Sequence, residues 1–166
     1  MRLDNKKEYN AVWDRVYNEL GFIPGYRENV PFRIDLPYCV YGIENMSIEQ
    51  LDRLEEIGKE IMIRVTNNGE RIYALDWQHD GFWYDPRNPE EQVDYRVEDA
   101  RYIGGGFNVY FPSFYPDGDY HFFIGENFDF GLLGHPWRNE IWIFGERLLS
   151  EFETVYRDLG LVKKQG

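Results

Sequence analysis

The chain has very little cysteine and no long apolar segment. Its 166 residues include a single cysteine, Cys39, so no disulfide can form within the chain. No run approaches the roughly twenty apolar residues that a membrane-spanning helix needs. The segment from Met1 to Lys7 leads into a polar pattern and not into the apolar core of a signal peptide. We therefore expect a cytoplasmic protein with a buried, unreactive thiol.

Positive charge is scarce as well. Thirty Asp and Glu residues stand against eighteen Lys and Arg, which gives a formal net charge of −12. Such a chain repels phosphate backbones and anionic lipid head groups, so neither nucleic acid nor membrane is an expected partner. The same charge favours association with a basic protein, although it is also an ordinary means of keeping a protein in solution.

Familiar catalytic and cofactor motifs are also missing. The three glycines Gly104-Gly105-Gly106 lack the frame of a phosphate-binding loop and precede a strand pattern, so a hinge or bulge is expected there. No serine lies in a G-x-S-x-G frame. No paired-cysteine or His-x-x-x-His spacing supports a metal site. Motifs alone therefore predict no cofactor and no metal, and they favour binding over catalysis.

Aromatic residues, in contrast, are abundant between Phe107 and Trp137. Eleven of these thirty-one residues are aromatic, and none is Lys or Arg. Gly, Pro and Asp interrupt the run, which is typical of successive strands joined by tight turns. Period-two patterns predict strands at 72–77, 82–84, 107–111, 120–124, 128–133 and 141–144, a short extended piece near 32–36, and a solvated connector at 85–99.

Helical patterns lie on both sides of these strands. Apolar residues at three- and four-residue steps predict helices from near Asp4 to Leu20, from Ser47 to Val65, and over about 148–159. Short connections between consecutive strands permit only antiparallel neighbours. We therefore predict a single α+β domain over 1–166. Its antiparallel sheet of five to six strands, built mainly from 71–149, packs against two to three helices that cover one face.

Three predicted turns carry side chains that could form a binding site. They are Asp76, Trp77 and His79 in the first, Asp117 and Asp119 in the second, and His135 and Trp137 in the third. If the strands bring these turns together, the carboxylates and imidazoles would line a metal or small-ligand site at one end of the sheet. A tight turn alone also explains Pro-Asp-Gly, since Pro presets one torsion and Gly supplies a positive φ. The remaining histidine, His121, lies inside a strand and is expected to be structural.

A second candidate surface is acidic. Glu90, Glu91, Asp94, Glu98 and Asp99 fall in the predicted connector, where they could face a basic partner. The corner formed by Gly134-His135-Pro136-Trp137 could add an aromatic anchor to such a surface.

Several segments resemble an uncharacterised bacterial family, the domain of unknown function 2716. The resemblance rests on Tyr115-Pro116-Asp117-Gly118-Asp119-Tyr120, on Phe128-Asp129-Phe130-Gly131-Leu132-Leu133-Gly134-His135-Pro136-Trp137, and on Ile143-Phe144-Gly145-Glu146-Arg147-Leu148-Leu149. Ala74-Leu75-Asp76-Trp77-Gln78-His79, followed by Tyr84-Asp85-Pro86, is similar to the same family. The resemblance implies a bacterial protein of one domain. It carries no activity.

Two functions from different classes stay open on the sequence. The favoured one is a cytoplasmic, acidic module that binds and neutralises or regulates a basic protein, in the manner of immunity or antitoxin-like proteins. The alternative is a metal- or small-ligand-binding enzyme with an Asp and His site at the sheet end. A domain whose partner leaves no trace in the sequence is a third option, and the sequence does not give the oligomeric state.

Overall fold

A seven-stranded antiparallel sheet lies at the centre of the computed structural model, which describes residues 1–25, 32, 33 and 35–165. The strand order is β3-β2-β6-β7-β8-β1-β9. The strands are β1 (Tyr38–Gly42), β2 (Ile72–Asp76), β3 (Gly81–Tyr84), β6 (His121–Gly125), β7 (Gly131–His135), β8 (Glu140–Phe144) and β9 (Val162–Gln165). The α+β class is confirmed, but the sheet has seven strands where five to six were predicted.

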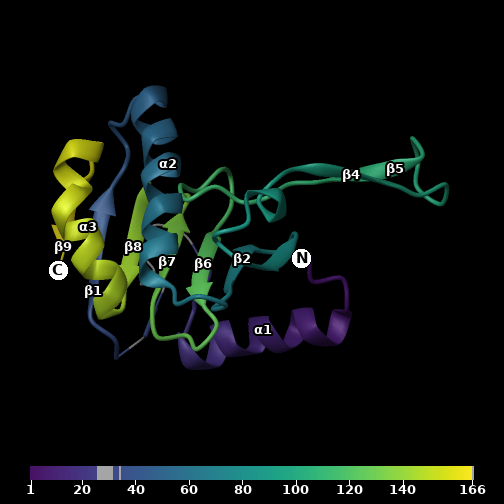
Figure 1. Cartoon of the computed structure of the whole chain (residues 1–166), viewed down its shortest axis with the longest axis horizontal. Coiled ribbons are helices and arrows are strands. Elements are labelled where there is room, and N and C mark those ends of the chain that lie inside the picture. Colours follow the sequence, from purple (N-terminus) through teal and green to yellow (C-terminus); the bar gives the residue numbers. More distant parts are fainter. Residues whose placement is uncertain (26–31, 34, 166) are drawn as a thin grey trace.

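Helices cover both faces of this sheet (Figure 1). α1 (Lys6–Glu19) packs on one face, while α2 (Ile48–Val65) and α3 (Glu146–Leu159) pack on the other. Every residue of β6, β7 and β8 is buried, as expected for strands covered on both sides. The prediction that helices cover only one face was wrong. Along these strands the residues that point to either face are buried, so both faces need a covering layer.

Two of the helices, α1 and α2, begin after a residue whose side chain caps them. Ser47 accepts the backbone N–H of Gln50 at 3.1 Å, and the Gln50 side chain accepts the N–H of Ser47 at 2.8 Å. This capping box satisfies two amides that have no partner within the helix. Asn5 caps α1 in the same way by accepting the N–H of Lys7. None of the helices in the described part of the chain combines the length and the apolar character needed to cross a membrane.

Two strands at one edge of the sheet were not predicted. β1 pairs with β8 and carries Cys39, whose thiol is buried as expected, and β9 pairs with β1. In the range 32–36 the described residues form no strand, while Pro31 and Ile34 lie outside the described residues. β9 reads Val-Lys-Lys-Gln and has no strand pattern of its own. It forms because Gly160, at φ 83°, ends α3 and returns the chain to the sheet edge.

One predicted strand belongs to a separate hairpin. β5 (Gly106–Val109) pairs with β4 (Tyr95–Glu98), and this pair projects away from the body (Figure 1). We call residues 93–110 the arm. The stretch 85–99, predicted as a connector, contains β4 and a short 3-10 helix, η1 (Pro89–Glu91). The three glycines turn the chain at the end of the arm, where a Cβ on Gly106 would lie 2.1 Å from the Val97 carbonyl oxygen.

Candidate functional site

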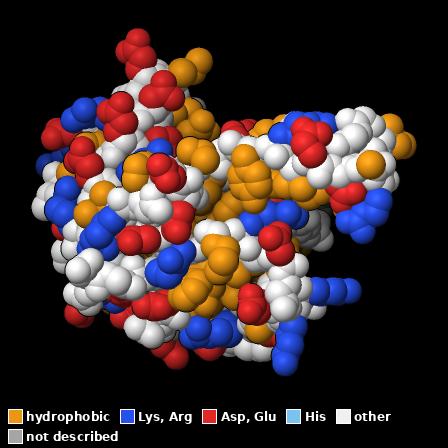
Figure 2. All heavy atoms as spheres, turned by 45° about the vertical axis from the view of Figure 1, so that its right-hand side comes forward, with side chains coloured by type: hydrophobic (Ala, Val, Ile, Leu, Met, Phe, Trp, Pro, Cys, Tyr) orange, Lys and Arg blue, Asp and Glu red, His pale blue; other side chains and the backbone are white. Residues whose placement is uncertain are grey.

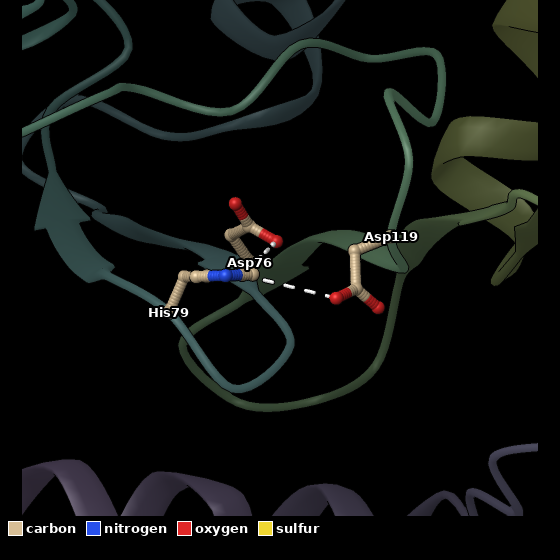
Figure 3. A group of neighbouring side chains, drawn as sticks. All are labelled: Asp76, His79 and Asp119. Atoms are coloured by element: carbon tan, nitrogen blue, oxygen red, sulfur yellow. Dashed lines mark hydrogen bonds and ion pairs between the residues drawn. The ribbon is translucent and has the colours of Figure 1, made fainter.

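Three of the predicted site residues meet at one end of the sheet (Figure 3). Asp76 ends β2, His79 lies in the turn that follows, and Asp119 precedes β6. Nδ1 of His79 lies 3.3 Å from Oδ1 of Asp76 and 3.8 Å from Oδ2 of Asp119. One possible ligand atom from each residue lies within 4.8 Å of the other two. We call these three residues the Asp–His cluster.

The turn that carries His79 is held by several hydrogen bonds. The Asp76 N–H donates to the Asp80 carbonyl at 3.0 Å, and the His79 N–H donates to the Asp76 carbonyl at 2.9 Å. Tyr9 of α1 donates its hydroxyl to the His79 carbonyl at 2.8 Å. Gln78 adopts a φ of 65°, which only a few non-glycine residues do. The backbone around the cluster is thus tied both to the sheet and to α1.

His121 lies beside the cluster, directly across from Asp76 in the antiparallel register. Its side chain is 5% exposed, and its Nδ1 lies 3.0 Å from the carbonyl oxygen of Ser113. Because a carbonyl oxygen can only accept, Nδ1 carries a proton. The other ring nitrogen, Nε2, lies 3.8 Å from Oδ1 of Asp76. His121 lies in a strand, β6, as predicted, but its contact with Asp76 depends on strand register, which the sequence did not give.

A hollow of about 310 Å³ opens next to these side chains. It is lined by Asp76, Asp94, Tyr110, Phe111, Pro112, Ser113, Tyr115, Asp117 and His121. Asp117 is exposed at this hollow and is not part of the Asp–His cluster. Burial raises the pKa of Asp76, and the nearby Asp119 carboxylate adds to the rise, while His121 and His79 oppose it.

His135 lies on the opposite face of the sheet. Residues two apart in a strand point to the same face, so His135 shares a face with Leu133, which packs in the core on the α1 side. By the same rule Asp76 shares the other face with Ala74, which packs in the core on the α2 side. The prediction that His135 occupies an exposed turn was wrong, because β7 continues to this residue and buries it completely. Its ring packs against Tyr120, with centroids 4.9 Å apart.

The setting of His135 keeps its ring neutral. The pKa of His135 is lowered to about 4, mainly by desolvation and also by the neighbouring Arg138, against an opposing effect of Glu140. Its Nδ1 accepts the backbone N–H of Arg138 at 3.4 Å. Nε2 is buried and has no hydrogen-bond partner among the described residues.

The two tryptophans predicted at the site also contact the α1-side core. Trp77 donates its indole N–H to the hydroxyl of Tyr17 at 2.9 Å. Its ring lies 5.6 Å from that of Tyr120 between centroids. Trp137 is half-buried, and its ring lies 5.3 Å from that of Tyr120 between centroids.

Four of the five acidic residues predicted to face a partner have partners within the chain. Glu91 pairs with Arg71 at 3.1 Å, Glu98 with Arg96 at 2.9 Å, and Asp99 with Arg101 at 2.6 Å, while Asp94 accepts the N–H of Phe111 at 2.8 Å. Glu90 is exposed at the base of the arm. The segment therefore presents less free negative charge than its composition suggests.

Exposed apolar side chains gather on the arm instead. Of the ten large hydrophobic residues that are exposed in the described chain, five lie on the arm: Val93, Tyr95, Tyr102, Ile103 and Tyr110. Figure 2 shows hydrophobic side chains at the surface along the arm and at its base. This surface was not among those predicted from the sequence. The available signal was Tyr102-Ile103, an apolar pair directly before the three glycines of a turn.

Comparison of the sequence with known proteins shows the family of this chain. The model of the family described as protein of unknown function (DUF2716) matches residues 3–149. The chain belongs to this family. It is also 30% identical over 159 residues to the uncharacterized protein YxiI of Bacillus subtilis (strain 168), with 90% of each chain covered. No solved structure matches the chain. The predicted family is confirmed, and the DUF2716 match includes α1, the Asp–His cluster and the arm.

Proposed function

We propose that this DUF2716 protein is an acidic protein-binding module, immunity- or antitoxin-like in kind, which contacts a basic protein partner through its arm. The observation that carries the proposal is the concentration of exposed apolar side chains on the arm. Large exposed apolar side chains gathered on one element are unfavourable in water and are typical of a protein interface. A bound protein partner would cover these exposed side chains of the arm.

The side chains of the arm suit this role. Tyrosine offers a large, rigid contact area with a polar edge and loses little conformational entropy on binding. Tyr102 is 50% exposed, and Ile103 at the end of the arm is fully exposed. A partner groove that accepted these two residues would gain the central apolar anchor that dominates many interfaces.

The arm is formed before any partner binds. An isolated two-stranded hairpin is only marginally stable in water, so contacts with the body matter here. The guanidinium of Arg2 lies over the Phe107 ring at 5.1 Å, and the Tyr102 ring lies 4.9 Å from the Phe107 ring. Phe111, just beyond the arm, packs against Phe82 at 5.0 Å. A pre-formed arm lowers the entropy cost of association.

Long-range attraction would come from the body and not from the arm. The arm holds Asp94, Glu98 and Asp99 against Arg96 and Arg101, so most of its charge cancels. The net charge of −12 is therefore carried mainly by the body. Such a field speeds the encounter with a basic partner and weakens as salt is added.

The test compares two variants that each remove exposed apolar side chains. Y102S/I103S alters the arm, and I48S/V162S alters two body residues that are 78% and 56% exposed. Each tagged protein would capture partners from its host, and the affinity of the purified partner would be measured at low and moderate salt. We expect the arm variant to bind at least tenfold more weakly, while the body variant binds like the parent protein.

Two results would contradict the proposal. Equal affinity of the arm variant and the parent protein would show that the arm is not the contact element. Sedimentation that reveals a dimer lost in Y102S/I103S would identify the partner as a second copy of this acidic chain, and not as a basic protein.

A further inference from the structure

We propose that the Asp–His cluster of Asp76, His79 and Asp119 binds a divalent transition-metal ion, with Nε2 of His121 directed at the same position. This site lies on the body and is independent of the arm. It joins two predicted turns and excludes His135, which the sequence had grouped with them.

The spacing of the donor atoms fits one ion. Zn²⁺ binds imidazole nitrogen and carboxylate oxygen at about 2.1 Å, so two ligand atoms of a tetrahedral site lie roughly 3.4 Å apart. Nδ1 of His79 lies 3.3 Å from Asp76 and 3.8 Å from Asp119. All three ligand atoms lie within 4.8 Å of one another. Side-chain rotations that move these atoms by less than about 1 Å would therefore complete the arrangement.

The buried His121 supplies an independent indication of a cation. Its Nδ1 proton points to the Ser113 carbonyl, and this is the arrangement by which proteins orient a histidine whose other nitrogen binds metal. With Nδ1 directed at Ser113, the other ring nitrogen of the buried His121, Nε2, faces Oδ1 of Asp76 at 3.8 Å, which is beyond hydrogen-bond distance. Nε2 makes no hydrogen bond with any described residue. A buried imidazole nitrogen and a carboxylate oxygen placed in this way can both bind one cation between them.

The carboxylates of the cluster have no arginine or lysine partner in the described chain, whereas Glu70 and Glu140 do. Glu70 pairs with Arg147, and Glu140 pairs with Arg138 at 2.7 Å. Among the described residues, only imidazoles form ion pairs with Asp76 and Asp119, each of which is about 20% exposed. A metal ion would supply the compensating charge that an arginine supplies elsewhere.

The donor set also limits which ion fits. Imidazole nitrogen combined with carboxylate oxygen suits Zn²⁺, Mn²⁺ or Fe²⁺ better than Ca²⁺ or Mg²⁺, which prefer oxygen alone. Asp76 and His121 both line the hollow of about 310 Å³. An ion in the cluster would thus keep a side open to water or to a ligand from the hollow.

The test uses the full chain without a tag, stripped of metal and titrated with Zn²⁺ alone. Calorimetry should show one ion per chain with a dissociation constant in the micromolar range or below. H79A and D119N should each raise that constant at least tenfold. The matched control is D117N, which changes an exposed carboxylate at the same hollow but outside the cluster, and it should stay within twofold of the parent protein.

The three variants alter side chains at or near the surface, and circular dichroism would verify their fold. Nitrogen-15 spectra should show Zn²⁺-dependent shifts of Nδ1 of His79 and Nε2 of His121, with His135 unchanged. No saturable binding below 1 mM would overturn the site. The same dissociation constant in the H79A/D119N double variant would overturn it as well, since the ion would then lie elsewhere.

Discussion

At the end of the sheet where β2 and β7 stop and β6 begins, the two faces have opposite chemistry. On the α2 side, Asp76 and His121 face each other beside a hollow that is open to solvent. On the α1 side, His135 is completely buried and packs against Tyr120. The same end of the sheet therefore carries a polar, accessible site on one face and a sealed aromatic core on the other.

The difference follows from how each face is covered. α1 supplies Trp13 and Val16 to the core above β6, and Leu20 and Phe22 join them after the helix ends. On the opposite face, the cluster lies where β2 joins its turn and β6 begins, next to the hollow. A histidine on the sealed face loses its charge, because desolvation there lowers its pKa. A polar residue on the open face keeps access to ions and ligands.

Removing an aromatic ring from the sealed face should have the largest effect on stability. Phe122 is fully buried, and its ring lies 5.6 Å from that of Trp13 and 4.9 Å from that of Phe22. F122A should lower the free energy of unfolding by about 3 to 5 kcal/mol, through lost burial and the cavity left behind. Urea denaturation measures this loss.

The contrast with the open face supplies the control. His79 is 61% exposed, so H79A should change the free energy of unfolding by less than about 0.5 kcal/mol. Similar losses in F122A and H79A would contradict the assignment of one sealed and one open face.

Protonation of His135 should have the next largest effect. Its pKa is about 4 in the folded chain, below the ordinary 6.5, so the unfolded chain binds a proton that the folded chain excludes. The free energy of unfolding should therefore fall as pH drops from 6.5 toward 4, by about 3 kcal/mol in total from this residue. H135N retains an acceptor for the Arg138 N–H and should lose this part of the pH dependence.

Chemical denaturation at a series of pH values provides the measurement. The difference in unfolding free energy between the parent protein and H135N should change with pH below 6.5. A difference that stays constant from pH 7 to pH 4 would show that His135 titrates normally and that this face is not sealed.

On the α2 side, Glu55 should give a smaller effect of opposite sign. Burial raises its pKa to about 7, against hydrogen bonds from the backbone N–H groups of Phe114 and Tyr115. The folded chain then retains a proton that the unfolded chain releases above pH 4.5, so this residue destabilises the fold as pH rises through 7. E55Q should be about 2 kcal/mol more stable than the parent protein at pH 8 and equal to it near pH 4.

Thermal and urea denaturation at the two pH values would test this prediction. Glutamine keeps an oxygen that can accept the Phe114 N–H, which Glu55 accepts at 2.5 Å, so the local structure has no reason to change. Equal unfolding free energies of E55Q and the parent protein at pH 8 would show that ionised Glu55 does not destabilise the folded state, which would contradict the raised pKa.

Much of the fold could be predicted because local rules agreed with the final packing. Ser47 and Gln50 marked the start of α2, and Gly160 marked the end of α3. Strand periodicity located five of the seven strands in the main sheet. β9 was not predicted because its four residues do not alternate between apolar and polar. β1 was not predicted because its short apolar stretch follows a proline-rich loop.

The candidate site was predicted only in part, for a related reason. Asp76, His79 and Asp119 were chosen because turns at strand ends expose polar side chains, and the structure brings them together. His135 was misplaced because the sequence did not show how far β7 extends. The partnership of His121 with Asp76 depends on the β2–β6 register, which is set by contacts between segments 45 residues apart in the chain.

The sequence by itself determined the three helices, the antiparallel connections, the acidic charge and the family, since each depends on local patterns or on composition. Tertiary structure alone decided which polar residues share a face, which of them are sealed from water, and that β4 and β5 leave the sheet as an arm. The physical reason is that strand register and layer packing are set by the burial of side chains from distant segments. A shift of one residue in register would move every side chain to the other face.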